Sequence, residues 1–130
     1  MIEFRSDVVG SLLRPDYLKE ARERFEAGEL AHAEFKGIED RAVNEAVALQ
    51  ADIGLDVVTD GEMRRENYIH YHCRRLDGID FANRKEMEFR PGYHGRVPVI
   101  IGPIRAQAPF LPSDWKAAQE LTNRPVKITL

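Results

Sequence analysis

The amino-acid sequence predicts an α/β fold, namely the N-terminal part of a (β/α)8 TIM barrel with an inserted β-hairpin. Two observations support this prediction. Over residues 2–59, short runs rich in branched apolar residues flank two helical patterns, in the order strand, helix, helix, strand. Polar clusters at residues 10–11 and 59–62 follow the two strands, and functional groups in α/β proteins gather at the carboxyl ends of strands.

Length and composition indicate one soluble domain that covers residues 1–130. The content of 43% hydrophobic and 32% charged residues is typical of globular proteins. A net charge of −3 with interleaved signs argues against nucleic-acid binding, and no apolar run is long enough to span a membrane. The single cysteine, Cys73, cannot form an internal disulfide, which favours a reducing compartment. We therefore expect a cytoplasmic protein.

The first half of the chain is predicted to form a parallel crossover. Strands are predicted at residues 2–9 and 55–59. Between them, Pro15 favours the first turn of a helix that ends near Gly28, and apolar residues at helical spacing predict a second helix over 31–53. Two consecutive helices between strands favour parallel pairing over a meander.

The second half is predicted to contain a helix, a hairpin, a short helix and a strand. In order these are residues 63–76, about 86–104, a helix that starts at 112–114, and 126–130. Pro98 places the second hairpin strand near an edge, and Gly102-Pro103 is expected to end the hairpin. Since a (β/α)8 barrel typically needs roughly 250 residues, we expect an incomplete barrel.

The segment His70-Tyr71-His72-Cys73 is the local candidate for metal binding. On a helix, His70 and Cys73 would share a face, whereas on a strand His70 and His72 would do so. A structural zinc site needs about four ligands, and no second His/Cys pair lies at a suitable spacing. Packing and surface hydrogen bonding are therefore the expected roles of these residues.

Two segments resemble the signature motifs of the cobalamin-independent methionine synthases and their single-barrel relatives. They are DVVGSLLRP at residues 7–15 and QADIGLDVVTDGEMRR at residues 50–65. Residues 76–78 and 125–130 also resemble this family, so the similarity extends over essentially the whole chain. The resemblance implies a TIM barrel that moves a methyl group from a folate-type donor to a thiol such as homocysteine, with zinc holding the thiolate.

The resemblance further implies that Gly10, Ser11 and Glu62 hold the amino-acid part of homocysteine. The chemistry agrees, because the Ser11 hydroxyl and a backbone N–H can bind a carboxylate, while Glu62 can accept hydrogen bonds from an ammonium group. Asp60 and Arg64 are further candidates that either orient Glu62 or touch the substrate.

The sequence departs from the family at two points. Relatives often carry a histidine before the Val-Gly-Ser step, where this chain has Val8. The zinc ligands of the family, a His-x-Cys pair with a later Glu and Cys, lie in the second half of the barrel. We therefore predict no metal ligand in these residues, and no methyl transfer by the 130-residue chain alone.

Two alternatives to this function remain open. One is a non-catalytic or partner-dependent barrel fragment, which would form a homo-oligomer or pair with a second chain that completes the barrel, because an incomplete barrel exposes strand edges and apolar surface. The other is a related barrel enzyme that uses another methyl acceptor.

Overall fold

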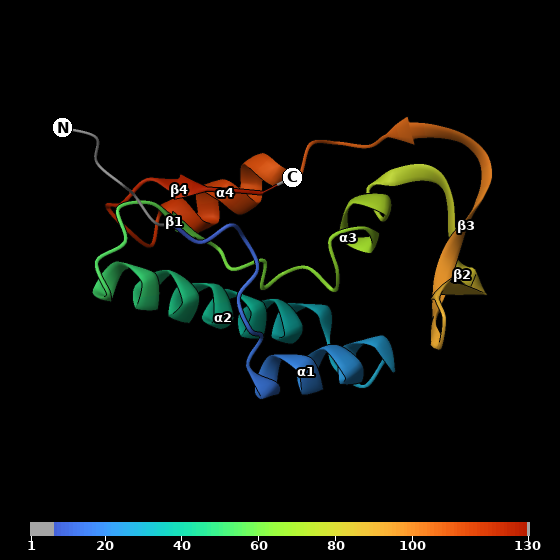
Figure 1. The fold of residues 1–130 in the computed structure, drawn as a ribbon, viewed down its shortest axis with the longest axis horizontal. Coiled ribbons are helices and arrows are strands. Elements are labelled where there is room, and N and C mark those ends of the chain that lie inside the picture. The colour runs from blue at the N-terminus through green and yellow to red at the C-terminus, as the bar shows by residue number, and fades with distance from the viewer. Residues whose placement is uncertain (1–6, 130) are drawn as a thin grey trace. The chain divides into compact units, whose positions relative to one another are not determined.

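A computed structural model describes residues 7–129, which divide into two compact units (Figure 1). The helical unit comprises the described residues up to Arg64 and those from Leu111 onward, and the hairpin unit is Arg65–Phe110. The helical unit contains α1 (Asp16–Glu26), α2 (His32–Asp52), β1 (Val58–Thr59), α4 (Leu111–Gln119) and β4 (Val126–Lys127). The hairpin unit contains α3 (His70–Cys73), β2 (Leu76–Arg90) and β3 (Tyr93–Ala106).

Helices α1 and α2 lie close to the predicted positions. Helix α1 begins directly after Pro15, and α2 ends with Ile53 as its C-terminal cap. The glycines that follow, Gly28 and Gly54, have φ angles of +77° and +89°. A residue without a Cβ adopts this left-handed conformation at little cost, so glycine ends both helices.

One hydrophobic core joins the elements of the helical unit. Helix α2 contributes more of its members than any other element, and this helix lies against α1 and β1. The buried apolar side chains are Leu18, Ala21, Leu30, Phe35, Ala42, Val43, Ala46, Val47, Val58, Met63, Ala118 and Val126. Each fully buried Leu or Val side chain contributes about 1.5–3 kcal/mol, so packing against the buried face of α2 stabilises β1.

Strands β1 and β4 pair in parallel, whereas the parallel crossover predicted between residues 2–9 and 55–59 stays a prediction. Val58 lies opposite Val126, and Thr59 lies opposite Lys127. Both strands are shorter than predicted and occupy only part of residues 55–59 and 126–130, the last of which lies outside the described residues. Because parallel strands leave a sheet at the same edge, the segments after Thr59 and Lys127 emerge side by side.

The strand predicted at residues 2–9 lies mostly outside the described residues. Residues 7–10 are not in a strand. Hydrogen bonds nevertheless join the next residues to the β1 end: Thr59 Oγ1 donates to Gly10 O at 3.0 Å, and Leu12 N donates to Gly61 O at 3.0 Å. The motif at residues 7–15 therefore lies against the motif at 50–65.

The predicted hairpin is present and is longer than residues 86–104. Strands β2 and β3 pair antiparallel around a turn at Pro91-Gly92. The prediction that Gly102-Pro103 ends the hairpin is wrong, because β3 continues to Ala106. A register shift between Asp77 and Ile79 accommodates this stretch, and a Cβ at Gly78 would lie 2.5 Å from the Pro103 carbonyl oxygen. Glycine at residue 78 allows the two backbones to approach.

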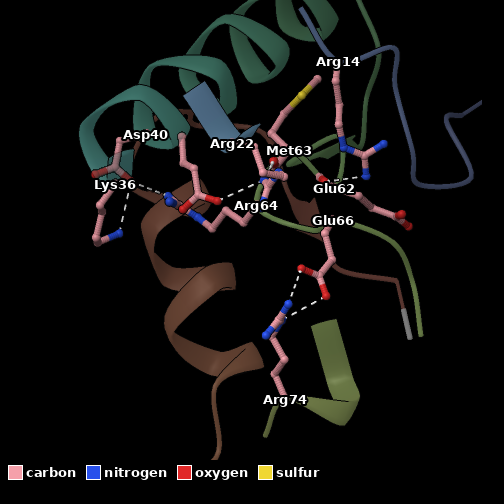
Figure 2. A network of polar contacts seen from close by, with 10 residues as sticks. Arg14, Arg22, Lys36, Asp40, Glu62, Met63, Arg64, Glu66 and Arg74 are labelled. Atoms are coloured by element: carbon pink, nitrogen blue, oxygen red, sulfur yellow. Dashed lines mark hydrogen bonds and ion pairs between the residues drawn. The ribbon is translucent and has the colours of Figure 1, made fainter. Parts of the chain in front are cut away.

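The helix predicted over residues 63–76 is wrong over most of its length. Only His70–Cys73 is helical, and Leu76 already belongs to β2. The Asn67 side chain accepts the N–H groups of Ile69 and His70, at 2.9 and 2.7 Å, which starts the helix late. After the short helix, the Arg74 side chain donates two hydrogen bonds to the carboxylate of Glu66, which precedes the helix (Figure 2). Local side-chain capping therefore replaces the long helix that the apolar spacing predicted.

Candidate functional site

The loop that leaves β1 has an unusual backbone. Gly61 and Glu62 have φ angles of +65° and +55°, and Glu62 is the one non-glycine residue with positive φ among those that the structure describes. A non-glycine residue in this region costs about 1–2 kcal/mol, so the surroundings must hold it there. Such backbone strain clusters at active sites and ligand-binding loops. The unusual backbone marks Glu62 as a functional candidate independently of its sequence motif.

Hydrogen bonds hold Glu62 at its N–H, its C=O and its carboxylate. The N–H donates to Asp60 Oδ1 at 3.0 Å, and the carbonyl oxygen accepts from Arg14 Nη2 at 3.1 Å (Figure 2). The carboxylate atom Oε1 accepts from Thr129 Oγ1 at 2.6 Å. Asp60 belongs to the same loop, but Arg14 and Thr129 are 48 and 67 residues away in the sequence, so the position of Glu62 depends on the tertiary fold.

Gly10 faces the Glu62 carboxylate with no room for a side chain. A Cβ at Gly10 would lie 2.6 Å from Glu62 Oε1 and 2.7 Å from Thr129 Oγ1. Gly10, Glu62 and Thr129 therefore form one group, here called the Glu62 cluster. Ser11 follows Gly10 and is exposed to solvent. The structure thus brings Gly10 and Glu62 together, and Ser11 is the residue that follows Gly10 in the chain.

Asp60 and Arg64, the two other predicted site residues, lie in different surroundings. Asp60 is buried, and its carboxylate accepts the Glu62 N–H, which makes it a support for the loop. Arg64 is buried too, but its Nη2 lies 2.6 Å from Asp40 Oδ1 on α2 (Figure 2). Arg64 thus pairs with Asp40 on the helix, whereas Asp60 contacts Glu62 itself.

A second arginine, Arg22, connects the loop after β1 to helices α1 and α2 by hydrogen bonds. Arg22 of α1 donates through Nη2 to the Met63 carbonyl oxygen and to Glu39 Oε1, each at 3.1 Å (Figure 2). Burial raises the pKa of Glu39 above its ordinary value, although the positive charge of Arg22 acts in the opposite direction. The half-buried Arg22–Glu39 pair therefore holds the loop against α1 and α2.

The pKa of Asp40 is lowered, whereas that of Glu39 is raised. Burial by itself would raise the pKa of Asp40, but hydrogen bonds and charge from Arg64 and Lys36 outweigh it, so the pKa lies below its ordinary value. The Asp40 carboxylate is accordingly ionised at neutral pH and attracts Arg64. This attraction holds the end of the loop against α2.

Sequence reasoning missed several residues that shape this site. Thr129 lies just past β4, in the predicted strand 126–130, and the rule that directed attention to Glu62 would also have found it. Arg14 lies within the first motif, at the start of α1. Gln50, a buried polar residue among the apolar side chains of α2, is visible in the sequence as an interruption of the stripe.

The described residues do not offer a zinc site. Among residues 7–129, no group of three or more His, Cys, Asp or Glu side chains is arranged to hold a metal ion. His70 Nδ1 lies 3.6 Å from Glu66 Oε1, and the ring of His70 contacts Phe81 edge-on. Cys73 is a half-buried free thiol. These residues pack and pair within the hairpin unit.

Within the same residues, no helix combines the length and the apolar character needed to cross a membrane.

The chain is similar to known methionine synthases in sequence and in structure. A 5-methyltetrahydropteroyltriglutamate--homocysteine methyltransferase of Mesorhizobium japonicum is 31% identical over 124 residues, which cover 95% of this chain and 16% of that protein. The structure of a B12-independent methionine synthase from Shewanella sp. W3-18-1, in complex with selenomethionine, matches with a TM-score of 0.70 and 29% identity. That match covers 78% of this chain and 30% of the other.

A second solved structure agrees with the first. The putative vitamin-B12 independent methionine synthase from Listeria monocytogenes matches with a TM-score of 0.69 and 30% identity, over 95% of this chain and 34% of that one. The chain therefore spans between 16% and 34% of the length of these relatives. The family model described as the catalytic domain of cobalamin-independent synthases matches residues 4–130. This chain belongs to that family.

Proposed function

We propose that the chain forms the amino-acid-binding part of a methyltransferase that moves a methyl group from a folate-type donor to homocysteine. The observation that carries the proposal is the Glu62 carboxylate, held against the backbone of Gly10 by a left-handed turn at the ends of parallel strands. The relatives support the reaction class, since one is named as a homocysteine methyltransferase and another was solved with selenomethionine.

The cluster suits the two charged groups of an amino acid. Glu62 can accept hydrogen bonds from the substrate ammonium group, and a carboxylate has about four lone-pair sites, so the bond from Thr129 does not exhaust it. At Gly10-Ser11, the hydroxyl and backbone N–H groups can donate to the substrate carboxylate. Asp60 and Arg64 hold the loop in place for this contact. The amino acid is bound by its α-carbon end, and its thiol is left for the methyl-transfer chemistry.

The fold supports the same proposal. We infer that the helical unit is the opening part of a (β/α)8 barrel and that the hairpin unit is an insertion within a single domain. In such barrels the binding residues lie at the carboxyl ends of the strands, and Glu62 and Thr129 follow β1 and β4 in this way. The proposal places the enzyme in the cytoplasm. The zinc that the family resemblance implies is assigned no ligand among residues 7–129.

Calorimetric titration of the chain with three thiols tests the proposal. L-homocysteine carries both charged groups, 4-mercaptobutanoate lacks the ammonium group, and 3-mercaptopropylamine lacks the carboxylate. Homocysteine should bind most tightly. Hydrogen bonds to charged groups contribute about 1.5–3 kcal/mol. Glu62→Gln should therefore lower the ratio of the affinities for homocysteine and 4-mercaptobutanoate by roughly 10- to 100-fold.

Glu23→Gln is the matched control, because Glu23 is an exposed glutamate on α1. It should bind all three thiols as the unchanged chain does. Equal affinity of the unchanged chain for homocysteine and 4-mercaptobutanoate would contradict the proposal.

A second candidate function is that of a module that assembles with other chains. The observation that favours it is a set of large apolar side chains exposed on β2 and β3, namely Met87, Phe89, Tyr93, Ile100, Ile101 and Ile104. Exposed apolar surface on a two-stranded hairpin favours association. Sedimentation velocity over a range of protein concentrations tests this candidate.

A further inference from the structure

We propose that Thr129 is a positioning residue for Glu62 and, through Glu62, for the ammonium group of the amino-acid substrate. This inference rests on the proposed function and adds a residue to its site. The Thr129 hydroxyl lies 2.6 Å from Glu62 Oε1, in the range of a hydrogen bond from a hydroxyl to an ionised carboxylate. The hydroxyl must donate in this pair, because an ionised carboxylate only accepts.

The Thr129 side chain is itself held in place. It lies against Gly10, where an added Cβ would be 2.7 Å from Oγ1 and 2.8 Å from Cγ2. A threonine has both a methyl group and a hydroxyl on its Cβ, so packing of the methyl group limits rotation and aims the hydroxyl. Gly10 thus provides the surface that orients Thr129, and Thr129 orients Glu62.

The backbone before Thr129 is anchored on two sides. β4 pairs with β1 through Val126 and Lys127. From α4, Trp115 Nε1 donates to the Val126 carbonyl oxygen at 3.0 Å, and Gln119 Oε1 accepts the Val126 N–H at 3.0 Å. A strand that a sheet neighbour and a helix both hold is a rigid base for a positioning group.

Glu62, by contrast, sits on a strained loop with a side chain of several rotatable bonds. A glutamate that is free to rotate must lose that freedom when it binds an ammonium group, which weakens binding. The bond from Thr129 restricts the carboxylate before the substrate arrives. Removal of the hydroxyl should therefore weaken binding of ligands that carry an ammonium group and leave the others unchanged.

Thr129→Val tests this prediction, since valine keeps the shape and removes the hydroxyl. Homocysteine should bind about tenfold more weakly, while 4-mercaptobutanoate should bind within about twofold of the unchanged chain. Thr129→Ser retains the hydroxyl and should keep most of the affinity for homocysteine. Thr122→Val is the matched control, because the Thr122 hydroxyl accepts the Arg124 N–H, away from the Glu62 cluster.

The conformation of the Glu62 side chain is also measured by NMR in the absence of any ligand. Three-bond NMR couplings across Cα–Cβ of Glu62 should report one side-chain rotamer in the unchanged chain and in Thr129→Ser, and rotamer averaging in Thr129→Val. Unchanged couplings in Thr129→Val would overturn the inference whether or not any thiol binds. Equal weakening of homocysteine and 4-mercaptobutanoate would overturn it too, because Thr129 would then only support the fold.

The two proposals fail in different ways. If Glu62→Gln leaves the preference for homocysteine intact, the proposed function is wrong, and the role of Thr129 in substrate binding is wrong with it. If Glu62→Gln removes the preference and Thr129→Val does not, the proposed function stands and the role of Thr129 is overturned.

Discussion

Gln50 and Thr59 exchange two hydrogen bonds between α2 and β1. Gln50 Nε2 donates to the Thr59 carbonyl oxygen at 2.8 Å, and the Thr59 N–H donates to Gln50 Oε1 at 3.0 Å. Both side chains are buried. The helix thereby pairs with the last residue of the strand, directly before the loop that carries Glu62.

Replacement of Gln50 by methionine should destabilise the chain. The variant keeps a similar volume but leaves the buried N–H and C=O of Thr59 without these partners, and each unsatisfied group costs about 1–3 kcal/mol. We expect the free energy of unfolding, measured with urea, to fall by roughly 2–4 kcal/mol. Gln107→Met is the control, since Gln107 bonds to Asp77 at an exposed site. Equal losses in the two variants would contradict the prediction.

Gly10→Ala should disturb the Glu62 cluster. The added Cβ would lie within 2.8 Å of atoms of both Glu62 and Thr129, so both side chains must move or the backbone at residue 10 must shift. We expect a loss of about 1–3 kcal/mol in the free energy of unfolding, with weaker homocysteine binding. Gly37→Ala provides the contrast, because nothing lies within 4 Å of its Cβ and alanine favours the helix α2 by up to about 1 kcal/mol. A Gly10→Ala variant that binds homocysteine normally would show that the cluster does not form the binding site.

Stability should depend on pH through Glu39. Because burial raises the pKa of Glu39 above 4.5, the folded chain keeps this proton at pH values where the unfolded chain has released it. The unfolded state then binds fewer protons, so the contribution of Glu39 to stability falls as pH rises from 4.5 through the raised pKa.

Glu39→Gln isolates this effect. The amide oxygen can still accept from Arg22, but the side chain no longer titrates. The free energy of unfolding of the variant, minus that of the unchanged chain, should increase as pH rises from 4.5 through the raised pKa of Glu39. Glu34→Gln controls for the loss of one charge from an exposed position on the same helix. Parallel pH profiles for Glu39→Gln and the unchanged chain would refute the assignment.

Association through the hairpin unit is the remaining prediction. Ile101 is 69% exposed on β3, so Ile101→Lys should reduce concentration-dependent association in sedimentation velocity. Ile53 at the end of α2 is 67% exposed, and Ile53→Lys should leave association unchanged. A chain that sediments as a monomer at every concentration would rule out this candidate function.

The two long helices were predictable from sequence because local signals agree with the fold there. Pro15, Gly28 and Gly54 mark helix ends by their own backbone preferences. The apolar stripe of α2 is buried as its spacing predicts in the middle of the helix, but Leu49 and Ile53 at its end are exposed. The helix over 63–76 was mispredicted for the opposite reason. Met63 and Arg64 are buried in tertiary contacts of the helical unit, and Asn67 starts a separate short helix.

The sequence by itself determined the two long helices α1 and α2, the order of the elements and the two motifs that contain Gly10 and Glu62, because each of these depends on neighbouring residues or on local spacing. Only the tertiary structure decided that Thr129 meets Glu62, that Arg64 turns toward Asp40, and that Gly10 must lack a side chain. These contacts join residues far apart in the chain. Their geometry follows from parallel pairing and core packing, which no local pattern encodes.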